Sequence, residues 1–154
     1  MNRILRHPAA NGICISLFSA FYALIFIITS GHREFTNLLY YSRHPQISSF
    51  WGSWSGFLAA GRHAYIAYGL LAITILVVIL LFLRRRAYDE YHTALLIQCL
   101  IVALVLTLIA IAAFFLIILS DANGIVEKFT LFITIHWATV VLADFTYVTL
   151  CRWK

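Results

Sequence analysis

Four long apolar runs constrain the fold of this chain more than any other feature. They occupy residues 11–30, 64–83, 93–119 and 129–150. Each has about 20 residues or more, the length that a helix needs to cross the hydrocarbon core of a bilayer. With 63% hydrophobic and 11% charged residues, the chain lies far from soluble proteins, in which about a quarter of the residues are charged. The sequence therefore predicts one all-α domain over residues 1–154, an integral membrane four-helix antiparallel bundle.

Basic residues flank these runs unevenly. An even number of spans places on one side Arg3, Arg6, Arg84, Arg85, Arg86, Arg152 and Lys154. The other side holds Arg33, Arg43, Arg62 and Lys128. The positive-inside rule then predicts that both termini are cytoplasmic. Because the basic residues lie at the ends of spans and form no continuous patch, they do not indicate nucleic-acid binding. We expect a multi-pass protein of a bacterial cytoplasmic membrane, whose first run is longer than the core of a secretory signal.

The segments between the runs predict how the helices are connected. Residues 50–60 repeat Phe and Trp at helical spacing, which indicates a short amphipathic helix at the outer membrane interface between the first and second spans. The short connection 121–128 contains the turn-forming pair Asn123-Gly124, so the third and fourth spans form a hairpin. The connection 84–91 is also short, and it predicts that the second and third spans are neighbours.

Asp144 is an ionisable residue inside the fourth run, where such side chains are costly and face the bundle interior. It lies about 9 Å from the cytoplasmic end of its span. Gln98 and Ser16 have similar depths in the third and first spans, so we expect an interhelical hydrogen-bond cluster that either Tyr147 or Thr146 closes. The cluster fixes the register of the helices, forms part of a proton or cation relay, or is a site for a partner within the membrane.

His136 is the second ionisable residue of the fourth run. It precedes Asp144 by eight residues, about 80° around the helix, so the two side chains cannot touch. Tyr65 and Tyr68 are the expected partners of its imidazole. Haem bound by two histidines would need a second imidazole at the same depth, and no other histidine of the sequence has that position. A single axial histidine ligand stays open, and the cofactor is unknown from the sequence.

The sequence predicts one further set of candidate ligands, on the outer face of the membrane. Imidazoles and carboxylates are suitable ligands for zinc and other divalent metals. The predicted topology brings to this face His32, Glu34, His63, Asp121 and Glu127. No pair has a recognised ligand spacing along one helix, so a metal site here is a hypothesis of topology alone.

No catalytic motif supports an enzyme, since nucleophile elbow, phosphate-binding loop and HExxH patterns are absent from the sequence. Our leading hypothesis is a non-enzymatic accessory or interaction subunit, whose partners are the lipid bilayer and either further copies of the chain or another membrane protein. One alternative is a small proton-coupled transporter or channel that uses His136 and Asp144. The other is a haem- or metal-binding membrane protein.

Overall fold

The computed structural model describes residues 8–44, 49–83 and 90–150, and all of its regular structure in these ranges is helical. The helices are α1 (Pro8–Ser30), α2 (Arg33–Leu38), α3 (Ser49–Ala59), α4 (His63–Leu83), α5 (Glu90–Ser120) and α6 (Ile125–Leu150). The predicted all-α class is confirmed. The four predicted spans correspond to α1, α4, α5 and α6, with boundaries that differ by a few residues.

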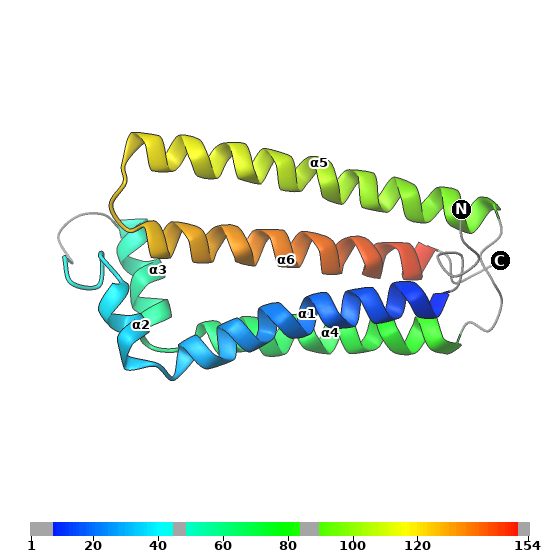
Figure 1. Cartoon of the computed structure of the whole chain (residues 1–154), viewed down its shortest axis with the longest axis horizontal. Coiled ribbons are helices and arrows are strands. Elements are labelled where there is room, and N and C mark those ends of the chain that lie inside the picture. Colours follow the sequence, from blue (N-terminus) through cyan, green and yellow to red (C-terminus); the bar gives the residue numbers. More distant parts are fainter. Residues whose placement is uncertain (1–7, 45–48, 84–89, 151–154) are drawn as a thin grey trace.

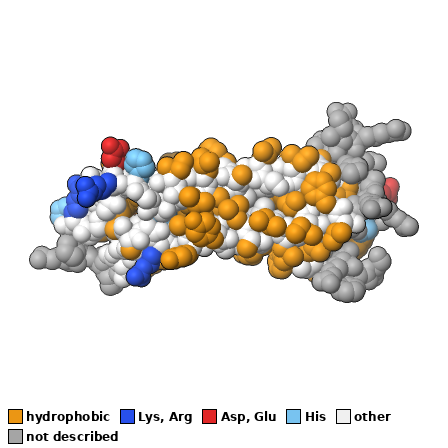
Figure 2. All heavy atoms as spheres, turned by 90° about the horizontal axis from the view of Figure 1, so that it is seen from below, with side chains coloured by type: hydrophobic (Ala, Val, Ile, Leu, Met, Phe, Trp, Pro, Cys, Tyr) orange, Lys and Arg blue, Asp and Glu red, His pale blue; other side chains and the backbone are white. Residues whose placement is uncertain are grey.

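Four helices are long and apolar enough to cross a membrane, namely α1, α4, α5 and α6. They lie lengthwise in one bundle (Figure 1). Apolar side chains cover the middle of the face shown in Figure 2, and the charged and histidine side chains lie toward the two ends. The basic side chains of the described residues are all at the end that carries α2 and α3. This distribution is that of a multi-pass membrane protein. All seven basic residues that the predicted orientation places in the cytoplasm, at positions 3, 6, 84–86, 152 and 154, lie outside the described residues.

The two ends of the bundle differ in construction. At the terminal end, α1 begins at Pro8 and α6 ends at Leu150 (Figure 1). A proline suits the first turn of a helix, where its missing N–H needs no partner. The opposite end, here called the cap end, carries α2 and α3. Helix α3 crosses this end at a steep angle to the long helices (Figure 1), as expected for the interfacial helix predicted at residues 50–60. The short helix α2 was not predicted.

The core is formed by α1, α4 and α6. Its central cluster joins Phe26 of α1, Ala67 of α4 and Trp137 of α6, all at most 1% exposed. A second cluster toward the terminal end joins Val77 and Leu81 of α4 to Tyr147 and Val148 of α6.

Helix α5 lies at the edge of this core. Ala103 is its one buried residue, and 6% of its most apolar stretch is buried, compared with 28% in each of the other three long helices. It packs along α6, which confirms the predicted hairpin. The prediction that the second and third spans are neighbours is largely wrong, because α5 makes few contacts with α4. A short connection limits the distance between two helix ends but not the packing of the rest of the helices.

Two glycines hold the cap end together. Gly61 (φ +69°) lies between α3 and α4, and a Cβ atom there would come within 2.6 Å of the Ser30 carbonyl oxygen. Gly124 (φ +63°) forms the turn between α5 and α6, and its Cβ would come within 2.1 Å of the Tyr41 ring. A positive φ and a close approach both require glycine. The Asn123-Gly124 turn signal is therefore correct, and it has a tertiary purpose as well.

Candidate functional site

A line of polar contacts runs through the core along α1, and we call it the polar ladder. It consists of the pairs Asn11–Asp144, Tyr22–His136 and Thr29–His63 and the triad Ser19–Thr74–Trp137. The α1 members extend from residue 11 to residue 29, about 27 Å at 1.5 Å per residue. The ladder therefore extends over most of the hydrocarbon core, which is about 30 Å thick.

Asp144 is buried at 3% exposure and accepts a hydrogen bond from the Asn11 side-chain amide at 3.1 Å. Its burial is as expected, but its partner is not among the residues predicted from depth. Ser16 donates to the backbone carbonyl of Gly12 at 2.7 Å. Tyr147 is fully buried in the apolar cluster at the terminal end.

The sequence does not predict Asn11 as the partner of Asp144, because Asn11 is the first residue of the apolar run 11–30. Helix α1 starts three residues earlier, at Pro8, which places Asn11 inside the helix and near the depth of Asp144. A count from the proline, the better signal for the helix start, could have found this pair. Gln98 lies on the exposed side of α5 and makes no hydrogen bond to any described residue.

The triad in the middle of the ladder links three helices. Thr74 donates to the carbonyl of Leu70 at 2.8 Å, so its oxygen accepts from Ser19 at 2.9 Å. The Ser19 oxygen accepts in turn from the indole N–H of Trp137 at 3.1 Å. All three polar groups are satisfied without water, as the membrane interior requires. Sequence reasoning missed this triad because serine and threonine in a helix commonly bond their own backbone.

His136 packs against α1 within a group of aromatic rings. Its Nδ1 lies 3.0 Å from the hydroxyl of Tyr22. Phe132 stacks on the imidazole with ring centroids 6.1 Å apart, and Phe18 contacts it edge-on at 5.6 Å. Tyr65 and Tyr68, the partners expected for this ring, are 72% and 54% exposed and do not contact it. The expectation was wrong because depth does not specify the side of a helix on which a residue lies.

His63 closes the ladder toward the cap end. The hydroxyl of Thr29 donates to the carbonyl of Ile25 at 2.7 Å, so its oxygen accepts from Nε2 of His63 at 3.1 Å. The imidazole is 1% exposed, with Phe26 and Phe35 against it. These contacts with Thr29, Phe26 and Phe35 give His63 a structural role in the core.

Glu127 anchors the cap to α6. Its Oε1 accepts from the backbone N–H of Tyr41 and from the hydroxyl of Ser55, both at 3.0 Å. Its backbone carbonyl accepts from the Trp54 indole at 3.0 Å. The side chain is fully buried. One carboxylate thus joins α3 and the segment after α2 to the first turn of α6.

Lys128 and Asp121 form a second contact at the cap end. The ammonium group of Lys128 is 3.1 Å from Oδ2 of Asp121, also binds the Asp121 backbone carbonyl, and lies 5.7 Å from the centre of the Trp51 ring. The Tyr41 hydroxyl donates to Asp121 at 2.8 Å. Hydrogen bonds from the Asn123 N–H, Tyr41 and Lys128 lower the pKa of Asp121 to about 2. Burial, followed by the bond to Asp121, raises the pKa of Tyr41 to about 12.

The candidate metal ligands of the outer face do not converge. His32 precedes α2 and Glu34 lies in its first turn, both exposed. The other three, His63, Glu127 and Asp121, each belong to a separate set of contacts described above. Within residues 8–44, 49–83 and 90–150, no three His, Cys, Asp or Glu side chains are arranged to hold a metal ion.

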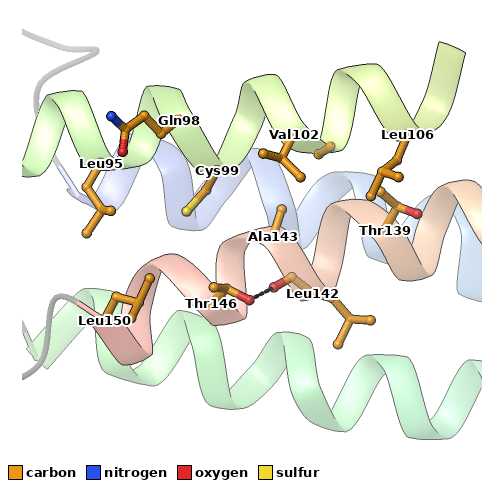
Figure 3. A pocket seen from close by; sticks show the side chains of 11 residues that line it. Leu95, Gln98, Cys99, Val102, Leu106, Thr139, Leu142, Ala143, Thr146 and Leu150 are labelled. Carbon is orange, nitrogen blue, oxygen red and sulfur yellow. Dashed lines mark hydrogen bonds between the residues drawn. The ribbon is translucent and has the colours of Figure 1, made fainter.

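A groove of about 400 Å³ lies between α5 and α6 in the half of the bundle near the terminal end (Figure 3). Leu95, Cys99, Val102 and Leu106 line it from α5, and Ala143 and Thr146 are among its residues from α6. Figure 3 shows Leu95, Cys99, Val102 and Leu106 pointing from α5 toward α6, with Gln98 on α5 near the end of the groove where α6 finishes.

Comparison with known protein families, with characterised proteins and with solved structures finds no match.

Proposed function

We propose that this protein is a non-enzymatic accessory or interaction subunit of a membrane, and that α5 supplies its binding surface. The observation that carries the proposal is the contrast in burial between α5 and the other three spans. Polar contacts and close packing hold α1, α4 and α6 together, whereas α5 spans the bilayer with one side against α6 and the rest exposed. A span that adds little to the core of its own chain is suited to pack against another protein.

The polar ladder supports the same proposal from within the core. Its serine, threonine, tryptophan and asparagine groups satisfy one another, which is the arrangement of a rigid scaffold. Such interhelical bonds stabilise helix association by about 0.5–2 kcal/mol each. A scaffold of this kind holds α6, and with it the surface of α5, in a constant position. We further propose a bacterial cytoplasmic membrane with both termini in the cytoplasm, in accord with the positive-inside rule.

Site-specific photocrosslinking in native membranes tests the proposal. A crosslinking residue at Leu108 of α5, 56% exposed, should give one defined adduct whose protein component has fixed stoichiometry after mild purification. The same residue at Tyr65 of α4, 72% exposed, is the matched control and should give mainly lipid adducts. If both positions capture only lipid, and native mass spectrometry shows a bare monomer, α5 is not a binding surface and the proposal is wrong.

The ladder also favours a second candidate, a proton-coupled carrier or channel. Asp144 and His136 are ionisable, and hydroxyl and indole groups lie between them along the bundle. If the chain carries protons, purified protein in liposomes should show a flux that falls strongly in Asp144→Asn and in His136→Ala. Unchanged flux in both variants, or no flux in the parent protein, would eliminate the carrier.

A further inference from the structure

Gln98 is a polar group of the α5–α6 groove, and no described residue is its hydrogen-bond partner. The other polar groups of that groove include the hydroxyls of Thr139 and Thr146, which donate to the carbonyls of Ile135 and Leu142, both at 2.7 Å. Gln98 makes no such bond to any described residue, although its amide has two donor hydrogens and an acceptor oxygen. It lies five residues inside the apolar run 93–119, where lipid supplies no hydrogen bonds.

The shape around Gln98 suits another helix. The groove is open along its length, since Val102, Leu106 and Leu142 are 58%, 48% and 48% exposed. Small residues, Ala103 and Ala143, line it between the larger side chains. Small residues allow two membrane helices to approach closely, and amide side chains bond across such interfaces. An acyl chain of a lipid could fill the groove, but it would leave the amide unsatisfied.

We infer that this groove is the interface with a second copy of the same chain, in a two-fold dimer in which the α5 helices face each other and the two Gln98 amides bond. Two copies inserted in the same orientation are related by an axis along the membrane normal, so Gln98 of one copy lies at the depth of Gln98 of the other. A primary amide is self-complementary, because it donates and accepts at once. The interface is isologous, the commonest form in homodimers. The inference rests on the proposed function and names its partner.

Disulfide mapping tests the geometry of the dimer. In full-length protein with Cys14, Cys99 and Cys151 replaced by alanine, Gln98→Cys should crosslink to a dimer when membranes are oxidised. The matched control is Leu100→Cys, two residues along α5 and 200° around the helix, which should remain monomeric. Equal crosslinking at both positions, or none at position 98, would overturn the proposed interface.

The strength of the amide pair is measured separately by energy transfer between labelled copies in liposomes. Gln98→Leu should weaken dimerisation by about 5- to 30-fold, and Gln98→Asn, which keeps the amide, by less. Gln98 is exposed in the monomer, so neither variant should unfold it. An unchanged dissociation constant in Gln98→Leu contradicts the role of the amide.

The outcomes also separate this inference from the proposed function. A monomer that crosslinks through α5 to a different membrane protein would overturn the dimer and leave the interaction subunit intact. A monomer that carries only lipid on α5 would overturn both. A dimer that crosslinks at position 98 but not at position 100 would support both.

Discussion

Helices α5 and α6 run side by side as one hairpin, but they have opposite roles in the bundle. Nine residues of α6 are buried, against one of the 31 residues of α5. The difference in burial matches the difference in how the polar side chains of the two helices are bonded. Helix α6 carries Asp144, Trp137 and His136, each bonded to α1, whereas the Gln98 amide of α5 bonds to no described residue.

The lipid environment explains why polar side chains account for the different burial of α5 and α6. Between apolar helices in a bilayer no hydrophobic force favours association, because lipid tails are as apolar as leucine. Close packing and hydrogen bonds then decide which spans form the core. Hydropathy alone does not separate core helices from the exposed one, since α4 of the core is nearly as apolar as α5. A few polar side chains bonded across the helices mark the core.

The largest loss of stability is expected when Trp137, an aromatic ring in the core, is replaced. Trp137→Ala removes a fully buried ring and leaves Ser19 without its indole donor. We expect a loss of about 2–3 kcal/mol in the free energy of unfolding in detergent micelles. This is below the roughly 3–5 kcal/mol of soluble cores, because detergent also solvates the apolar ring in the unfolded state and burial then gains little hydrophobic free energy. The control Phe115→Ala on α5, where the ring is 58% exposed, should change the free energy by less than about 0.5 kcal/mol. Equal losses in the two variants would show that α5 belongs to the core.

The turn that joins the two helices gives the next largest effect. Gly124→Ala must adopt a positive φ and displace the ring of Tyr41, so it should destabilise the protein by about 2 kcal/mol in the same unfolding assay. Gly56→Ala is the matched control, since the space around its Cβ is open and α3 is helical there. That variant should be neutral or more stable by about 0.5–1 kcal/mol. A tolerant Gly124 would mean that the cap does not hold the α5–α6 turn.

A smaller effect is expected at the terminal end of the ladder. Asp144→Ala leaves the Asn11 amide without its acceptor and should cost about 1–2 kcal/mol in the free energy of unfolding. Asp144→Asn keeps an acceptor oxygen in place and should be close to neutral. The same pair of variants sharpens the question of function, because a proton carrier would lose its flux in Asp144→Asn without losing stability. A large loss of stability in Asp144→Asn would show that the negative charge itself holds the helices.

The smallest effect concerns the pH dependence of the cap. The folded protein holds the pKa of Asp121 at about 2, below its ordinary value of 3.8, so the ionised form favours folding. This contribution is present above about pH 4 and is lost as the pH falls from 4 toward 2. Thermal unfolding across this range should therefore show a steeper acid loss of stability in the parent protein than in Asp121→Asn. Identical profiles would exclude Asp121 as the group responsible, and Glu34→Gln, at an exposed carboxylate on α2, is the control.

Much of the fold could be predicted from the sequence, and the reasons are local. Apolar length predicted all four spans, the aromatic spacing predicted the helix at the cap end, and Asn123-Gly124 predicted the turn of the α5–α6 hairpin. The burial of Asp144 followed from the cost of a carboxyl group in lipid. Each of these inferences needs only the composition or spacing of a short segment.

The contacts of the candidate site could not be predicted in the same way. Depth along a span follows from counting residues, but a span that is apolar on every side gives no signal of which side faces the bundle. For that reason Asp144 was assigned to Gln98 and Ser16 and not to Asn11, and His136 was assigned to tyrosines of α4 and not to Tyr22. The candidate metal ligands were likewise placed at one end of the bundle by topology, and the fold distributes them among different partners.

The sequence by itself determined that this protein crosses a membrane four times and that ionisable groups lie within its last span, because hydropathy and length act residue by residue. Only the tertiary structure decided that three of the four helices form the core, that a ladder of polar contacts joins them, and that α5 is left with a free face. Those features depend on the rotation of each helix about its own axis. In lipid, side-chain packing and hydrogen bonds determine that rotation, and neither can be read from the apolar pattern of a single span.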